Sequence, residues 1–145
     1  MTGAPTPGDC LFCVPGHKIL CESMRFYARF DTFPANCGHV EIVPRRHIVS
    51  LWELSPDEVF EAWSLLTEAR ALLDAEHHPD AWTVGVNEGK AAGRSVDHLH
   101  IHLIPRFHGD VPDPRGGVRR CAPNCRPDEW GGDLSAHRTV HLEDR

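Results

Sequence analysis

Apolar and polar residues alternate in several short segments of the chain, most clearly in DHLHIHLIP at residues 97–105. Three histidines, His98, His100 and His102, occupy every second position there, with apolar residues between them. Side chains at i, i+2 and i+4 of a β-strand share one face, whereas in a helix these positions spread around the axis. The pattern therefore predicts a strand whose apolar side faces a core and whose other face carries a row of imidazoles.

Further alternating segments predict how the strands pair. MRFYARFDTF (24–33) and HVEIVP (39–44) stand on either side of the turn sequence PANCG, which predicts an antiparallel hairpin. WTVGVN (82–87) precedes the histidine segment and is joined to it by the glycine-containing loop EGKAAGRSVD (88–97). We expect these last two strands to be partners as well.

One main helix is predicted between the two pairs of strands. Ser55 as N-cap, Pro56 in the first turn and Glu58 three residues after the cap form a capping box. The apolar face is predicted from Val59, Trp63, Leu66 and Leu73, and the helix should end near His77-His78-Pro79. The order of elements predicts an α+β fold with an antiparallel sheet of about five strands, followed by an extended C-terminal tail.

Composition limits the classes of function. A chain of 145 residues with 41% hydrophobic and 25% charged residues is typical of one soluble domain. The net charge of −6 argues against bulk nucleic-acid binding, although it allows one nucleotide in a locally positive pocket. No apolar run approaches the roughly 20 residues of a membrane span, and the N-terminus lacks the regions of a signal peptide. We therefore expect no membrane partner and a cytoplasmic protein.

The histidine row allows three interpretations. It could decorate an exposed sheet face, it could place His98 and His100 on a catalytic metal, or it could supply a nucleophilic imidazole. The preceding loop carries Asn87, Gly93 and Ser95, and backbone N–H groups exposed by glycine bind phosphate oxygens. An ordinary hairpin loop has the same composition, but its junction with the histidines favours a phosphate held against imidazoles.

Six cysteines in a chain of this kind indicate metal or redox chemistry more than disulfides. Cys10 and Cys13 form a C-x-x-C pair, which is half of a zinc site, a redox pair or two core thiols. Spacing alone does not select the remaining ligands, for which the candidates are His17, His39, His47, His98 and the pair Cys121 and Cys125.

The segment GVNEGKAAGRSVDHLHIHLIPR resembles the motif of the histidine triad (HIT) family of nucleotide hydrolases and transferases. GHVEIVPRRHIVSLWELSP resembles the second strand and the helix entry of that family, and GDVPDPRGGVR resembles a tail of its bacterial members. The resemblance covers roughly residues 9–119, so we expect a HIT-like domain there, a flexible N-terminus at 1–8 and a C-terminal extension at 120–145. The sequence after Val118 matches no family feature, and a second metal site at Cys121 and Cys125 remains an alternative to a surface extension.

This resemblance implies a role for each matching residue. His100 would attack the α-phosphorus of a nucleoside phosphoramidate or dinucleotide polyphosphate and form a nucleotidyl-histidine intermediate. His102 would contact the phosphate, with His98 completing the triad. Asp31 would bind the ribose hydroxyls. Asn87 and Ser95 would bind phosphate oxygens or the departing group, with Ser95 counted among the catalytic residues, and Gly93 and Arg94 among the substrate-binding ones.

The resemblance also implies a cofactor and an assembly. Zinc-bearing relatives nominate His47 and His98 to join Cys10 and Cys13, which would make the zinc structural. Family members form dimers, so a homodimer is expected. The alternatives are a metal-dependent hydrolase that uses the histidine row as catalytic ligands, and a nucleotide-binding regulatory module with negligible turnover.

Arg94 departs from the family, whose members usually carry Gln at this position. A guanidinium pointing inward would add a charge-assisted hydrogen bond to a phosphate-rich ligand. Alternatively, Arg94 faces solvent and pairs with Glu88 or Asp97, where it would contribute little.

Overall fold

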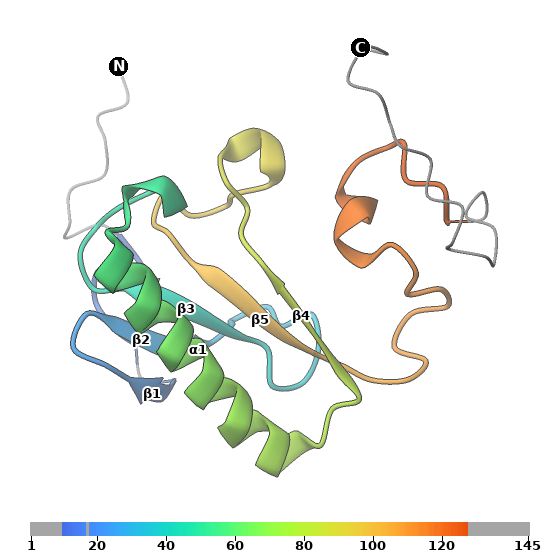
Figure 1. The fold of residues 1–145 in the computed structure, drawn as a ribbon, viewed down its shortest axis with the longest axis horizontal. Coiled ribbons are helices and arrows are strands. Elements are labelled where there is room, and N and C mark those ends of the chain that lie inside the picture. Colours follow the sequence, from blue (N-terminus) through green and yellow to red (C-terminus); the bar gives the residue numbers. More distant parts are fainter. Residues whose placement is uncertain (1–9, 17, 128–145) are drawn as a thin grey trace. The chain divides into compact units, whose positions relative to one another are not determined.

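A five-stranded antiparallel sheet forms the frame of the protein, with strand order β1-β2-β3-β5-β4 (Figure 1). The strands are β1 (Ile19–Glu22), β2 (Phe26–Phe30), β3 (Val40–Pro44), β4 (Ala81–Gly85) and β5 (Ile101–Arg106). This confirms the predicted fold class, in which an antiparallel sheet of about five strands is combined with one main helix. The sequence pattern did not identify β1, whose four residues ILCE do not alternate.

The computed structural model describes residues 10–16 and 18–127, so the predicted flexible N-terminus at 1–8 lies outside the described residues. Of the predicted extension at 120–145, only residues 120–127 are described. The chain divides into two compact units, Met1–Pro112 and Asp113–Arg145. The first contains the sheet, the helix α1 (Pro56–His77) and two 3-10 helices, η1 (Leu51–Glu53) and η2 (Lys90–Ala92); the second contains the 3-10 helix η3 (Gly117–Cys121). No helix in the described part is long and apolar enough to cross a membrane.

Helix α1 begins at the predicted capping box. The Ser55 hydroxyl accepts the Glu58 N–H at 3.3 Å, and the Glu58 carboxylate accepts the Ser55 N–H at 2.9 Å. These bonds satisfy two N–H groups that the first turn leaves without helical partners. The helix ends at His77, as predicted, because His78 adopts the left-handed conformation with φ of 49°.

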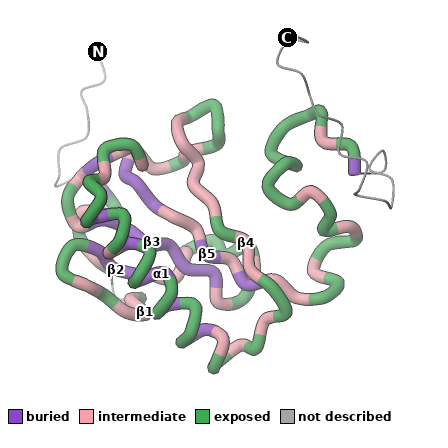
Figure 2. Tube along the Cα trace, in the orientation of Figure 1, coloured by how far each residue is buried: buried purple, intermediate pink, exposed green. Residues whose placement is uncertain are grey.

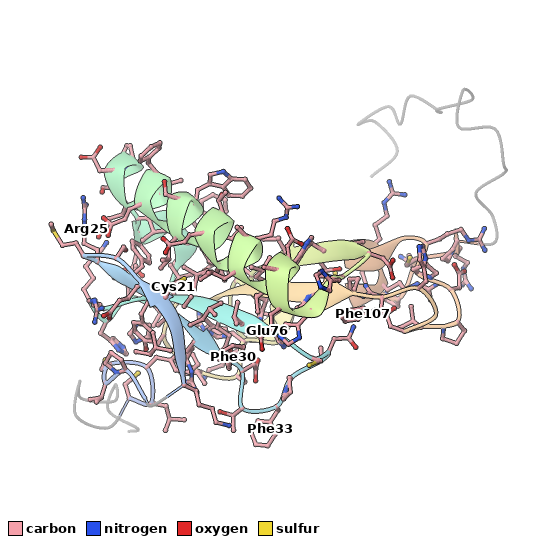
Figure 3. All side chains as sticks on the ribbon, turned by 90° about the horizontal axis from the view of Figure 1, so that it is seen from below. Cys21, Arg25, Phe30, Phe33, Glu76 and Phe107 are labelled. Atoms are coloured by element: carbon pink, nitrogen blue, oxygen red, sulfur yellow. The ribbon has the colours of Figure 1, made fainter. Side chains whose placement is uncertain are left out.

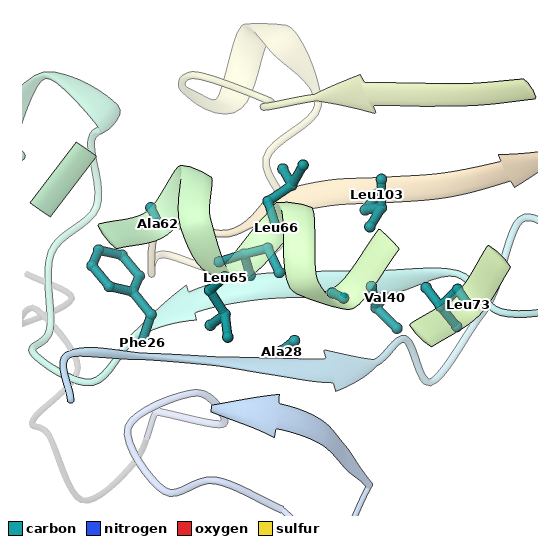
Figure 4. Close-up of a cluster of buried hydrophobic side chains, with 10 residues drawn as sticks. Phe26, Ala28, Val40, Ala62, Leu65, Leu66, Leu73 and Leu103 are labelled. Carbon is teal, nitrogen blue, oxygen red and sulfur yellow. The ribbon is translucent and has the colours of Figure 1, made fainter. Parts of the chain in front are cut away.

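The helix covers one face of the sheet (Figures 1 and 3), but the predicted apolar face was wrong in part. Leu66 and Leu73 are buried, whereas Val59 and Trp63 are 49% and 63% exposed. The stripe that packs on the sheet instead consists of Ala62, Leu65, Leu66, Ala69 and Leu73. Figure 4 labels four of these, Ala62, Leu65, Leu66 and Leu73, beside Phe26, Ala28, Val40 and Leu103. Both stripes have helical spacing, so only the packing decides between them: alanines let the helix approach the sheet closely.

The opposite face of the sheet is covered by the N-terminal segment. Cys10 and Phe12 pack there with Tyr27 and Val43. The Tyr27 hydroxyl donates to the Phe12 carbonyl at 2.5 Å, and burial raises the pKa of this tyrosine to about 12. Strand β3 is consequently buried along its whole length, as Figure 2 shows.

The histidine segment is less regular than predicted. Strand β5 begins at Ile101, so His98 and His100 precede the strand and only His102 lies within it. A backbone hydrogen bond holds the residues before β5 in place instead: the Leu99 N–H donates to the Ile48 carbonyl at 2.7 Å. His98 is 0% exposed and His100 is 4% exposed, which rules out the interpretation of the row as an exposed, decorative face.

Candidate functional site

Four predicted metal ligands lie together where the N-terminal segment meets the histidine segment. The Cys10 sulfur lies 3.3 Å from Nδ1 of His98, and the Cys13 sulfur lies 3.2 Å from Nδ1 of His47 and 3.7 Å from Nδ1 of His98. Ligands of a tetrahedral zinc ion at the usual bond lengths are separated by about 3.3–3.8 Å. The four donors therefore fit the dimensions of a structural zinc site.

Hydrogen bonds from neighbouring residues position two of these ligands, His98 and His47. Nε2 of His98 lies 2.8 Å from the Pro44 carbonyl, which can only accept, so Nε2 carries the proton and Nδ1 is free to bind a metal. Arg46, next to His47, donates to the Glu58 carboxylate at 2.6 Å. The start of α1 therefore fixes the segment that brings His47 to the two cysteines.

His100 presents a free nitrogen lone pair. Its Nδ1 lies 2.8 Å from the His98 carbonyl. Because a carbonyl oxygen only accepts, the Nδ1–H donates and Nε2 of the neutral ring keeps its lone pair. The Phe12 ring packs edge-on against this imidazole with centroids 5.3 Å apart, so the orientation of the ring is fixed by packing as well as by the hydrogen bond.

His102 presents the opposite chemistry, a donor. The Ala35 N–H donates to Nδ1 of His39 at 3.1 Å, so the His39 proton lies on Nε2. Nε2 of His39 lies 3.0 Å from Nδ1 of His102 and donates to it, which leaves the proton of His102 on its own Nε2. The rings of His100 and His102 are nearly perpendicular, at 85°, with centroids 5.0 Å apart. A lone pair and an N–H donor therefore stand side by side.

Burial keeps this part of the site neutral. It lowers the pKa of His102 to about 4, and the charges of His100 and His39 act in the same direction. Burial also lowers the pKa of His39, against the opposing effect of Asp31. The His102 ring is therefore neutral at pH 7 and can still donate its Nε2–H to a phosphate oxygen.

Comparison with known proteins gives the family. The HIT domain family model matches residues 15–109. The chain belongs to the HIT domain family. It is 35% identical over 94 residues to AP-4-A phosphorylase of Mycobacterium tuberculosis, covering 64% of this chain and 48% of that protein. It is also 30% identical over 102 residues to the nitrilase and fragile histidine triad fusion protein NitFhit of Caenorhabditis elegans, covering 70% of this chain and 23% of the relative.

A solved HIT structure bears on the metal. The Zn-bound histidine triad family protein from Mycobacterium smegmatis aligns with a TM-score of 0.64 and 29% identity, over 80% of this chain and 92% of that one. The chain spans about a quarter to a half of the length of the two curated relatives named above.

The loop of this HIT domain brings some of the predicted substrate-binding residues together. Gly93 has φ of 95°, which only glycine adopts without strain, and a Cβ there would lie 3.9 Å from Cγ of Asn87. Ser95 is exposed at the end of the loop. The binding roles of Asn87, Gly93 and Ser95 remain predictions.

Arg94 is engaged within the HIT domain. Its guanidinium lies 3.0 Å from the Asp97 carboxylate and donates to the Val49 carbonyl at 3.1 Å. Of the two partners considered from the sequence, Asp97 is therefore the observed one, and Glu88 accepts the Leu51 N–H instead. The side chain is only 15% exposed, so the expectation that a paired Arg94 would face solvent was wrong.

Asp31 joins the histidine cluster through residues that the sequence interpretation did not assign to it. His39 was considered as a zinc ligand, but it lies between Asp31, at 3.5 Å, and His102. Glu41, two residues further along the chain in β3, was not singled out at all, although it is 5% exposed. The available signal was the single acid in the otherwise apolar strand VEIVP.

Cys121 and Cys125 belong to the second unit. Neither is part of a group of three or more candidate metal ligands in the described portion of the chain, and a second metal site there remains an open alternative.

Proposed function

We propose that the chain is a nucleotide hydrolase or nucleotidyltransferase that cleaves at the α-phosphate of a nucleoside phosphoramidate or dinucleotide polyphosphate. One observation carries the proposal: Nε2 of His100 offers a lone pair beside the N–H donor of His102, and buried hydrogen bonds fix both rings. The names of relatives agree, since they include an AP-4-A phosphorylase, a bis(5'-adenosyl)-triphosphatase and a bis(5'-nucleosyl)-tetraphosphatase.

The reaction proceeds in two displacements. Nε2 of His100 attacks the α-phosphorus, the bond to the leaving group breaks, and the leaving group takes the electron pair and a proton from solvent. The ring keeps its Nδ1–H on the His98 carbonyl and becomes a cationic nucleotidyl-imidazole. Water or another acceptor then attacks phosphorus and releases a proton to solvent, and the P–Nε2 bond breaks so that its electron pair returns to Nε2.

The remaining site residues bind and orient the substrate in this proposal. The Nε2–H of His102 donates to a phosphate oxygen and stabilises the charge that develops there. Asp31 accepts from ribose hydroxyls, and the loop residues Asn87, Gly93 and Ser95 hold phosphate oxygens or the departing group. Arg94 braces the loop through Asp97 and Val49.

Zinc is proposed as a structural cofactor held by Cys10, Cys13, His47 and His98. The spacing of the four donors and the Zn-bound relative support it. Four protein ligands leave no position for water, so the zinc stabilises the fold rather than activating a nucleophile. Thiolate ligands also favour a reducing compartment, which supports a cytoplasmic location.

The rival in which His98 and His100 share a catalytic metal is disfavoured by the same contacts. Both nitrogens of His98 are engaged, Nδ1 beside the two cysteines and Nε2 on the Pro44 carbonyl. His98 could reach a metal on His100 only by breaking one of these sets of contacts.

A homodimer is proposed for the assembly. Strand β4 is an edge strand of the sheet, and helix α1 exposes a second apolar stripe of Val59, Phe60 and Trp63, with Phe60 75% exposed. Unpaired strand edges and exposed apolar patches both favour association. Light scattering should give twice the chain mass of 16.2 kDa at micromolar concentration, and a monomer mass throughout that range would contradict the proposal.

The decisive test of function is a brief reaction with a nucleoside phosphoramidate, which is then quenched without acid. The intact protein is analysed by mass spectrometry. The wild type should gain the mass of one nucleotidyl group, and His100→Ala should gain none. Calorimetric binding of AMP without adduct or turnover would instead support a nucleotide-binding regulatory module.

A further inference from the structure

Glu41 occupies the centre of the polar side of the sheet. On β3 it pairs directly with Arg29 of β2 and with His102 of β5, so these three side chains emerge from neighbouring strands at one level. Its carboxylate is 7% exposed and lies 3.8 Å from Nε of Arg29. An oxygen of Glu41 and one ring nitrogen each of His100 and His102 all lie within 4.8 Å of one another.

Burial of an ionised carboxylate costs folding free energy unless hydrogen bonds and an opposite charge compensate it. The pairing is incomplete, because 3.8 Å to Arg29 is too long for a hydrogen bond. Arg29 is shared as well: it lies over the Phe12 ring at 4.8 Å and donates to the Thr32 hydroxyl at 3.1 Å. The neighbouring carboxylate of Asp31 raises the pKa of Glu41 further, so a second acid adds to the cost of ionising it.

We propose that Glu41 is a positioning residue for nucleotidyl transfer: its buried carboxylate compensates the positive charge that the His100 ring gains in the covalent intermediate. The inference rests on the proposed function. No bond to Glu41 forms or breaks, and its effect acts through His100. An opposite charge within about 5 Å in a poorly solvated site stabilises a cation by far more than it would in water.

The charge of Glu41 depends on pH in the range where the enzyme would work. Burial raises the pKa of Glu41 to about 7, the charge of Asp31 adds to the rise, and Arg29 opposes it. The titratable and charged groups that face it are Tyr27, Arg29 and Asp31 from β2 and its following turn, and His100 and His102 from the β5 segment. Ionised Glu41 supports the intermediate, so adduct formation should accelerate as pH rises through about 7.

The test compares the wild type with Glu41→Gln, because glutamine matches protonated glutamate in size. Single-turnover adduct formation on a nucleoside phosphoramidate is followed by mass spectrometry at about pH 5.5 and 8.5, on either side of the raised pKa. We expect Glu41→Gln to be slower by roughly tenfold or more at the alkaline pH and by less than about threefold at the acidic pH, with the concentration that gives half the maximal adduct rate nearly unchanged.

Two further variants separate this role from a structural one. Arg29→Gln removes the charge that lowers the pKa of Glu41, so the midpoint of the pH profile should move to higher pH. Glu76→Gln is the matched control on α1, where the carboxylate is 65% exposed and lies beside His77 (Figure 3), and it should reproduce the wild-type profile.

The outcomes are distinct. Three results would overturn the role of Glu41 alone. These are a Glu41→Gln rate that still rises with pH as in the wild type, an equal loss of rate at both pH values, and an unchanged midpoint of the pH profile in Arg29→Gln. Absence of any nucleotidyl adduct on the wild type overturns the proposed function, and the role of Glu41 with it.

Discussion

The two polar clusters of the site divide one histidine triplet between them. His98 belongs to the sulfur-rich cluster with Cys10, Cys13 and His47, whereas His100 and His102 belong to a cluster with carboxylates. In the first, nitrogens and sulfurs converge at distances that suit a metal. In the second, each ring is bonded so that it presents one defined nitrogen, bearing either a lone pair or a proton.

The difference shows that identical side chains at identical spacing present opposite ring nitrogens because their neighbours differ. His98 donates through Nε2 to Pro44 and turns Nδ1 towards the thiols, whereas His100 donates through Nδ1 to the backbone and keeps Nε2. Backbone carbonyls therefore decide which nitrogen of each ring is available. Removal of a member of one cluster should leave the other nearly intact.

The largest effect is expected from His100→Ala. Loss of the proposed nucleophile should reduce kcat by about a thousandfold or more, as for other nucleophile deletions. Zinc content and AMP affinity should stay within a few-fold of the wild type, because His100 is not one of the four metal ligands. Retention of a tenth of the wild-type kcat would disprove the assignment.

Cys10→Ser should act on the other cluster. We expect loss of zinc together with about 2 kcal/mol or more of unfolding free energy, because structural metal binding contributes to folding. Elemental analysis should give about one zinc per wild-type chain, and thermal denaturation should follow the loss in the variant. Full zinc in a variant lacking both Cys10 and Cys13 would contradict the site, and two zincs per wild-type chain would support the alternative at Cys121 and Cys125.

Acid should weaken the carboxylate-rich cluster. His102 has a folded pKa of about 4, below the ordinary value of 6.5, so its contribution is complete above 6.5 and is lost as pH falls towards 4. That contribution amounts to roughly 3 kcal/mol. Chemical denaturation of the wild type and His102→Gln between these pH values should show the shallower dependence for the variant. Parallel curves would mean that His102 does not carry the acid sensitivity.

The smallest effect is expected from Arg94→Gln. Because Arg94 is engaged by Asp97 and Val49, kcat/KM should fall by less than about threefold on both a dinucleotide polyphosphate and a phosphoramidate, with about 1 kcal/mol lost in stability. A loss of about tenfold confined to the polyphosphate at low salt would instead place the guanidinium on the substrate.

The sequence by itself determined the helix bounds, most of the strands and the identity of the motif. Capping boxes, turns and two-residue alternation are local codes, so Ser55, Glu58 and the hairpin around PANCG were predictable from neighbouring residues alone. The C-x-x-C pair and the three histidines were equally visible. The resemblance implies their division between two clusters, and the distances in the structure fit that division.

Tertiary structure decided what depends on residues far apart in the chain. Packing against the sheet determines which stripe of α1 is buried. Ala62 and Ala69 lie in the core, whereas Val59 and Trp63 are exposed. His39 and Glu41 became neighbours of His102 only because β3 pairs with β5 across some sixty residues. Hydrogen-bond partners at that separation select the proton position of each imidazole, and no local pattern encodes them.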